Sequence, residues 1–293
     1  MRLTLGQRTH DLRSRPLVMG ILNRTRDSFF DRGAHYAADA FLRHAERLVN
    51  DGADILDVGA RPGGVGVKPV SAAEETQLAA ASVAMLGARF DVPISVDTTR
   101  AAVATAAFAE GAVMGNDMSG FADPDYLPAA ARAGAGVVAT HIRLPPGVPD
   151  PEPEYDDLLE DVKRALEELA ARAVGAGVPA ERIVVDPGFD LGKTWRQSLA
   201  LLGHVGVLTA MGRPVLIAVS NKIFLGRALS LDTGERSTAT VAACAFGVAA
   251  GGRVLRVHDV RAGRQVADLY AAVRDAAEEH EPRAAAGDRG FGR

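Results

Sequence analysis

The chain has 293 residues, 47% hydrophobic and 24% charged, which is enough for one large α/β domain with a sizeable core. Its net charge of −4 is small and its basic residues do not cluster, so we expect no nucleic-acid partner. The N-terminus lacks an apolar signal segment and no apolar run is long enough for a membrane span, so we expect no membrane association. The single cysteine, Cys244, excludes an internal disulfide and fits a reducing, cytoplasmic setting.

Short apolar runs alternate with helix-like segments along the whole chain. The expected strands are 17–22, 54–58, 93–96, 112–115, 136–140, 183–185, 214–219 and 254–257. The expected helices are 36–50, 71–89, 99–110, one opened by Asp123 and Pro124, 155–176, 195–210, 235–250 and 261–277. This unbroken alternation predicts an α/β fold, a closed (β/α)8 TIM barrel of one domain, with a doubly wound open sheet as the alternative. We expect the barrel to span 16–278, with an N-terminal appendage at 1–15 and a flexible tail at 279–293.

The stretch IVVDPGFDLGKT (183–194) places an acid, Asp186, at the end of a β-branched run and before a glycine-bearing turn. A phosphate-binding P-loop needs four residues between its two glycines, whereas Gly188 and Gly192 have three residues between them. A nucleoside-triphosphate site is therefore not predicted here. Asp186 must therefore have a role other than in a P-loop.

Polar side chains stand at the end of every expected strand. They are Asn23, Asp57 followed by Arg61, Asp97, Asn116 with Asp117, His141, Asp186, Ser220-Asn221-Lys222, and Arg256 with His258. In a barrel these positions share one mouth, where catalytic groups gather. A strand-end Asp or Asn can instead cap the next helix. Because barrel strands are otherwise apolar, however, a polar residue at the end of each strand favours a functional site.

The residue types divide this mouth into two halves. Acids and amides on Asp97, Asn116 and Asp186 suit the N–H edge of a flat, nitrogen-rich heterocycle. The strand ends at 220–222 and 256–258 supply hydrogen-bond donors and positive charge for an anion such as a phosphate. The sequence has no Cys/His cluster for structural zinc and no Gly-x-Ser-x-Gly nucleophile motif.

Six segments together resemble the successive motifs of dihydropteroate synthase, a family of pterin-binding barrels. They are MGILNRTRDSF (19–29), ISVDTTRAAVA (94–104), NDMSG (116–120), VVDPGFDLGKT (184–194), VSNKIFLG (219–226) and RVHDV (256–260). The resemblance implies a (β/α)8 barrel, a cytoplasmic homodimer, and a transferase of folate biosynthesis. Such an enzyme joins 4-aminobenzoate to 6-hydroxymethyl-7,8-dihydropterin diphosphate with Mg2+ as cofactor, giving 7,8-dihydropteroate and diphosphate.

Carried onto this sequence, the resemblance implies that Asp97, Asn116 and Asp186 hold the edge of the pterin. Lys222 would reach the pterin carbonyl, and Arg256 would lie against the ring. The pterin-binding set is therefore Asp97, Asn116, Asp186, Lys222 and Arg256.

The resemblance assigns the diphosphate to Asn23, Arg61, Arg256 and His258, and the metal to Asn23. Asp27 would stabilise the cationic pterin that remains as diphosphate departs. The implied catalytic residues are Asn23, Asp27, Lys222 and Arg256. Phe29 and Ser220 would bind the aminobenzoate, with its carboxylate at Ser220.

Four motifs depart from the family pattern. The first loop has Arg26 where the family has Pro, and the loop after Asp57 is shortened and lacks a Ser-Thr pair. Asp190-Leu191 replaces a Gly and an aromatic residue, and Asn221 replaces Arg. The pterin acids are retained while the second-substrate loops differ, as in divergent bacterial paralogues of the synthase. The alternatives are therefore a paralogue that binds a pterin phosphate with little or no synthase activity, or another pterin- or folate-binding transferase such as a methyl-transfer relative.

Overall fold

The structure is a computed structural model that describes residues 1–25, 37–61 and 70–280. Within these ranges eight strands form one parallel sheet in the order β8-β7-β6-β5-β4-β3-β10-β9. The strands are β3 (Leu17–Asn23), β4 (Ile55–Gly59), β5 (Ile94–Asp97), β6 (Met114–Asp117), β7 (Gly136–Thr140), β8 (Ile183–Asp186), β9 (Leu216–Ile217) and β10 (Val254–Val257). A parallel bridge between Val185 and Val215 joins the two edges, so the sheet closes into the predicted (β/α)8 TIM barrel.

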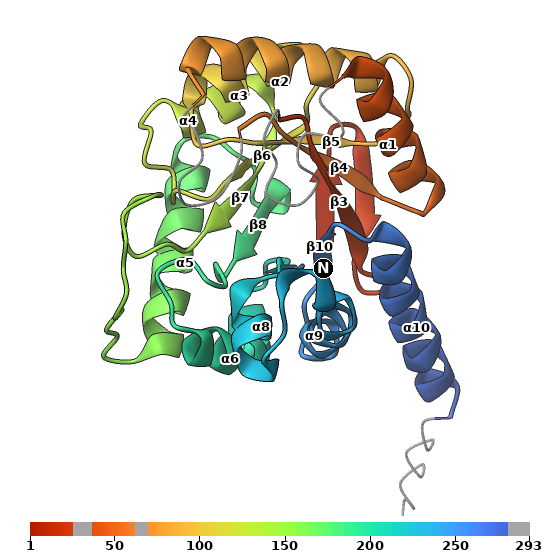
Figure 1. Cartoon of the computed structure of the whole chain (residues 1–293), viewed down its shortest axis with the longest axis vertical. Helices are drawn as coiled ribbons and strands as arrows, with labels where there is room; N and C mark the ends of the chain where they lie inside the picture. Colours follow the sequence, from red (N-terminus) through yellow and green to blue (C-terminus); the bar gives the residue numbers. More distant parts are fainter. Residues whose placement is uncertain (26–36, 62–69, 281–293) are drawn as a thin grey trace, which may run out of the picture.

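Helices follow the strands and surround the sheet (Figure 1). They are α1 (Ala38–Asn50), α2 (Ala72–Gly87), α3 (Ala101–Ala109), α4 (Tyr126–Ala133), α5 (Leu158–Gly175), α6 (Trp195–Gly203), α7 (Val205–Thr209), α8 (Ile223–Leu229), α9 (Ser237–Ala249) and α10 (Val260–Glu279), with short 3-10 turns at Ala180–Arg182 and Thr233–Glu235. Side-chain caps fix several of their starts: Ser71 accepts from the Glu74 N–H, and Thr194 and Gln197 form a capping box.

Several elements differ from the sequence-based expectation, and α4, for example, begins at Tyr126 rather than at Asp123 and Pro124. Strand β6 begins at Met114, two positions after the expected start, so Asn116 and Asp117 belong to the strand itself. The expected helix at 195–210 is divided at His204, whose Nδ1 lies 2.8 Å from the carbonyl oxygen of Ala200. Helix α8 was not expected, because its seven residues are too few to show a helical period.

The N-terminal residues close the amino ends of the barrel strands. Strands β1 (Arg2–Leu5) and β2 (Arg8–Asp11) form an antiparallel hairpin. Leu3, Leu5 and Leu12 are buried in one cluster with residues that begin the barrel strands, including Leu17, Ile55, Met114 and Val254. Because this end is filled by aliphatic side chains, the opposite end is left as the face for polar chemistry.

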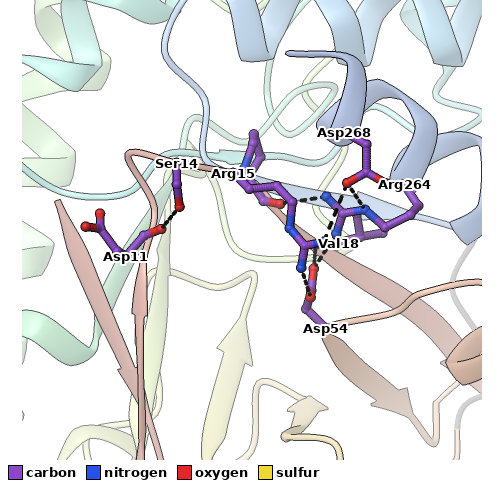
Figure 2. Close-up of polar contacts among 8 residues, drawn as sticks. Asp11, Ser14, Arg15, Val18, Asp54, Arg264 and Asp268 are labelled. Atoms are coloured by element: carbon purple, nitrogen blue, oxygen red, sulfur yellow. Dashed lines mark hydrogen bonds and ion pairs between the residues drawn. The ribbon is translucent and has the colours of Figure 1, made fainter. Parts of the chain in front are cut away.

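A network of hydrogen bonds and ion pairs stabilises this closed end of the barrel (Figure 2). Asp54, just before β4, accepts hydrogen bonds from the Val18 N–H at 2.8 Å, from Arg264 at 2.8 Å and from Arg15 at 3.2 Å. Arg264 also pairs with Asp268, one turn further along α10, at 2.8 Å. The Asp54 carboxylate thus links the segment before β3, β3 itself and helix α10.

Candidate active site

The strand register brings the polar strand ends together at one mouth. Asp97 at the end of β5 pairs in register with Asn116 of β6 and with Gly59 of β4, which itself pairs with Asn23 of β3. Asp186 ends β8. In parallel strands the carboxyl ends lie on the same side of the sheet, so these side chains share one rim.

Arg256 is the centre of a charged cluster at this mouth. Its Nε donates to Asp57 Oδ2 at 2.6 Å and its Nη2 to Asp97 Oδ2 at 2.5 Å. The amide of Asn116 donates to the same Asp57 oxygen at 2.9 Å. Two strands, β4 and β5, therefore present carboxylates to one guanidinium from β10, and the Asn116 amide of β6 joins the cluster through Asp57.

The electrostatics of this cluster follow from burial and charge. Burial disfavours the charged form of Arg256, but Asp57 and Asp97 oppose it and raise the net pKa of the guanidinium. For Asp97, burial raises the pKa to about 6, although Arg256 works in the other direction. The other oxygen of Asp57, Oδ1, is buried without a hydrogen-bond partner among the residues that the structure describes. The cluster therefore keeps unused hydrogen-bonding capacity.

Asp186 and Lys222 form the second charged part of the mouth. Asp186 Oδ1 accepts from the Gly188 N–H at 2.7 Å, and Lys222 Nζ donates to the carbonyl oxygen of Phe189. Burial raises the pKa of Asp186, opposed first by Lys222, and burial lowers the pKa of Lys222, opposed first by Asp186. The turn requires glycine at 188, because its φ is +69° and a Cβ would lie 1.9 Å from the His141 carbonyl oxygen.

Lys193 forms hydrogen bonds with the same turn. Its Nζ lies 2.8 Å from His141 Nδ1 and donates to the Gly188 and Leu191 carbonyl oxygens at 3.0 Å each. Burial lowers the pKa of Lys193 to about 7, and burial with the nearby Lys193 charge lowers the pKa of His141 to about 3. With its donors occupied by β7 and the β8 loop, Lys193 fixes the shape of the turn that carries Asp186.

Ser220 and its neighbours form the side of the mouth after β9. Ser220 Oγ lies 2.8 Å from His258 Nδ1 and accepts from the His258 N–H at 3.2 Å. Asn221 has a φ of +55°, a conformation that Asn adopts more readily than most residues, and its N–H donates to Thr240 at 3.0 Å. Ser220 and His258, both proposed from the sequence, are therefore in direct contact.

The remaining predicted residues lie at or beyond the edge of this cluster. Gly59 lacks a side chain where a Cβ would collide with Asn23 Oδ1, so the Asn23 amide lies tightly against β4. Arg61 is close enough to Asp97 to oppose the rise in its pKa. Asp27 and Phe29 lie outside the described residues.

Three site residues received no role from the sequence. Asp57 was seen only as a strand-end acid, and its contact with Arg256 joins positions 199 residues apart, which no local pattern reveals. Lys193 and Asp190 lie within the motif at 184–194, and the one available signal was the departure of Asp190 from the family pattern. The structure places Asp190 near Lys222, and Lys193 near both Lys222 and Asp186.

The fold and this mouth define the class: a (β/α)8 barrel with acids, an amide and two cations at the carboxyl ends of its strands. Residues 19–258 match the family described as pterin binding enzyme, and the chain belongs to that family.

Individual relatives and a solved structure show that the chain is similar to dihydropteroate synthases. The "Inactive dihydropteroate synthase 2" of Mycobacterium tuberculosis is 41% identical over 264 residues, which cover 88% of this chain and 83% of that protein. The dihydropteroate synthase of Bacillus subtilis is 37% identical, with 89% of this chain and 90% of that protein covered. The crystal structure of Yersinia pestis dihydropteroate synthase with a sulfonamide drug complex superposes with a TM-score of 0.89 at 37% identity, covering 94% of this chain and 100% of that one.

Proposed function

We propose that this chain is a dihydropteroate synthase-type transferase that binds 6-hydroxymethyl-7,8-dihydropterin diphosphate and transfers its pterin to 4-aminobenzoate. The observation that carries the proposal is the mouth cluster of Asp57, Asp97, Asn116 and Arg256 beside the Asp186–Lys222 pair. It offers carboxylate and amide groups for a heterocycle edge, next to cations for phosphate oxygens. Family membership over 19–258 supports the same substrate class.

Binding follows from the chemistry of each group. The amidine-like N–H edge of the pterin pairs with Asp186 and Asn116, and Asp97 lies beside them in register. The Lys222 ammonium is placed for the pterin carbonyl, and the Arg256 guanidinium for the ring face and a phosphate oxygen. Since Asp57 and Asp97 already hold Arg256 in place, little of its side-chain freedom is lost when the ligand binds.

The reaction needs charge stabilisation more than a strong base. The bond between the pterin methylene carbon and the diphosphate oxygen breaks, diphosphate leaves with the electron pair, and the amine nitrogen forms the new bond and loses a proton. The carboxylates around the pterin stabilise the cationic ring that remains, and Arg256, Arg61 and His258 hold the departing anion. We assign the same stabilising role to Asp27 and an aromatic contact with aminobenzoate to Phe29, as the family resemblance implies.

The residues present fit Mg2+ held mainly by the substrate. No group of three or more His, Cys, Asp or Glu able to hold a metal occurs within 1–25, 37–61 and 70–280. Mg2+ is often bound by one or two protein oxygens together with substrate phosphates, and the amide oxygen of Asn23 at the end of β3 is such a donor. When bound, Mg2+ would neutralise charge on the leaving diphosphate.

A second candidate, a paralogue that binds a pterin phosphate with little or no synthase activity, has its own support. The relative named inactive is 41% identical, against 37% for the Bacillus subtilis synthase. The departures from the family pattern also lie at Asp190, Leu191 and Asn221, on the rim of the mouth, while the pterin acids remain.

Diphosphate release from dihydropterin diphosphate with Mg2+, measured with and without 4-aminobenzoate, separates the two candidates. Release coupled to formation of 7,8-dihydropteroate is the result expected for the synthase. Binding of the pterin diphosphate without turnover would instead establish the second candidate. No binding at all would refute both.

We also propose that the protein is a cytoplasmic homodimer. Support for the dimer comes from large apolar side chains exposed on the adjacent helices α9 and α10: Phe246 is 69%, Leu269 66% and Val273 61% exposed. Large apolar side chains exposed on neighbouring helices are typical of a protein–protein interface. The lone, buried Cys244 is consistent with a reducing compartment. None of the helices in the described ranges is long and apolar enough to cross a membrane.

A further inference from the structure

The turn from Gly188 to Gly192, which follows β8, has an unusual backbone. Its first, third and fifth residues, Gly188, Asp190 and Gly192, have φ values of +69°, +63° and +60°. Glycine adopts such values freely, but other residues such as Asp190 seldom do. Backbone of this kind persists where the surrounding structure fixes it. The turn therefore depends on side chains that hold its peptide groups in place.

The buried Lys193 ammonium contacts this turn at two points and one residue outside it. Its Nζ donates to the carbonyl oxygens of Gly188 and Leu191 at 3.0 Å each, and it lies 2.8 Å from His141 Nδ1 at the end of β7. An ammonium has three N–H groups, so these three neighbours use all of them. Lys193 thus joins both ends of the Gly188–Leu191 segment to the neighbouring strand.

His141 can keep this contact in either protonation state of Lys193. When Lys193 is charged, its third N–H donates to Nδ1, and the imidazole proton lies on Nε2. When Lys193 is neutral, two N–H groups remain for the carbonyl oxygens, and the amine lone pair accepts from Nδ1–H. Burial lowers the pKa of Lys193 to about 7, while burial and the Lys193 charge lower the pKa of His141 to about 3. His141, a polar strand end that received no role from the sequence, is therefore a neutral partner that suits both forms of Lys193.

The same turn holds two groups that are expected to bind the pterin. The N–H of Gly188 donates to Asp186 Oδ1 at 2.7 Å, while the carbonyl oxygen of Gly188 accepts from Lys193. The next carbonyl oxygen, that of Phe189, accepts from Lys222 Nζ. The peptide groups that orient Asp186 and Lys222 are consequently the ones that Lys193 fixes.

We propose that Lys193 and His141 are positioning residues of the pterin site, which hold the turn after β8 in the shape that orients Asp186 and Lys222 toward the pterin. Neither side chain contacts the pterin or takes part in the bond changes. The inference rests on the proposed function, because it concerns the affinity of the same pterin site. Groups that are already held in their binding positions lose less freedom when a ligand binds, so loss of these contacts should lower the affinity for pterin.

The test is the dissociation constant of 6-hydroxymethylpterin, measured by calorimetry on the full chain at a temperature where urea unfolding shows each variant to be folded. Lys193→Met keeps an unbranched stem without the ammonium, and we expect it to raise the dissociation constant about tenfold. Tyr155→Phe is the matched control. The Tyr155 hydroxyl donates to the carbonyl oxygen of Gly192 at 2.7 Å, so this variant also removes a hydrogen bond to the turn, but one that reaches neither Gly188 nor Phe189. Its dissociation constant should equal that of the unaltered chain.

A second pair of variants tests the contribution of His141. Asparagine at this position places its Oδ1 where Nδ1 stood, so His141→Asn keeps an acceptor for Lys193, whereas His141→Leu removes it. We expect His141→Leu to raise the dissociation constant about fivefold and His141→Asn to leave it nearly unchanged. This pair decides the question alone if Lys193→Met does not fold.

Three results would overturn the positioning role while the unaltered chain binds the pterin. They are normal affinity in a folded Lys193→Met variant, equal losses of affinity in Lys193→Met and Tyr155→Phe, and equal affinities in the two His141 variants. Failure of the unaltered chain to bind 6-hydroxymethylpterin is a separate result, which refutes the proposed function and the positioning role with it.

Discussion

Asp54 and Asp57 stand three positions apart along one strand segment, and each is bound by an arginine from the last βα unit of the barrel. Asp54 lies at the closed amino end and pairs with Arg264 of α10 (Figure 2). Asp57 lies at the open carboxyl end and pairs with Arg256 of β10. The Asp54 side chain is 16% exposed, whereas the Asp57 side chain is fully buried.

The difference lies in how completely each carboxylate is satisfied. Both oxygens of Asp54 have hydrogen-bond donors, from Arg15 on one and from Val18 and Arg264 on the other. Asp57 uses only Oδ2, and its Oδ1 has no partner in the described part of the chain. A satisfied network at one end stabilises the barrel, while an incompletely satisfied one at the other end retains capacity for a ligand.

Arg256→Met should have the largest effect. It leaves the fully buried Asp57 and its neighbour Asp97 without their cation, which typically costs about 3–5 kcal/mol of unfolding free energy. Urea unfolding measures this loss. The double variant Asp57→Asn/Arg256→Met should recover part of it, because the charge of the fully buried Asp57 is then gone while Asp97 stays without its cation. A single variant as stable as the unaltered chain would contradict the described ion pairs.

Lys222→Met should weaken binding of pterin diphosphate about 100-fold, or about 2.7 kcal/mol. The ammonium is expected to contact the pterin carbonyl, and methionine keeps the stem without the charge. Calorimetry gives the dissociation constant, and Lys163→Met, a change at a half-buried position of α5 outside the described site, is the control. Unchanged affinity for the Lys222 variant would mean that this side chain takes no part in binding.

Asp97→Asn should alter the pH dependence of stability by about 3 kcal/mol. Burial raises the pKa of Asp97 from 3.8 to about 6, so the folded state holds this proton more tightly than the unfolded state. The resulting stabilisation is complete below about pH 4 and is lost as the pH rises through 6. The unfolding free energy of the unaltered chain relative to the variant should therefore fall between pH 4 and 7. A difference that stays constant would show that the Asp97 pKa is not raised.

Arg264→Met should have the smallest effect, about 1 kcal/mol, because Asp54 retains the Val18 N–H and Arg15 as donors. Pterin binding should not change, since Arg264 lies at the closed end. Comparison with Arg256→Met in the same urea experiment tests the contrast directly. Equal losses for the two arginine variants would remove the distinction between the two ends.

The barrel itself was predictable from the sequence. Its strands are buried on both faces, so they read as short apolar runs, and the expected segments 136–140 and 254–257 coincide with β7 and β10. Strand-end polarity likewise indicated where a site would form. Elements with few residues gave no such signal, as α8 shows.

Pairing between distant positions was not predictable. No local pattern links Asp57 with Arg256, because only closure of the barrel brings β4 and β10 to either side of β3. The departure at Asp190 was visible in the sequence, but its positive φ and its contact with Phe224 arise from tertiary packing.

The most direct test of the pterin-site assignment is calorimetric titration of the unaltered chain and Asp186→Asn with 6-hydroxymethylpterin. Asparagine can still accept from the Gly188 N–H, so the turn and the fold should persist. We predict clear binding to the unaltered chain and none to the variant, with nearly equal unfolding free energies. A stably folded variant that binds the pterin as tightly as the unaltered chain would contradict the assignment of this mouth as the pterin site.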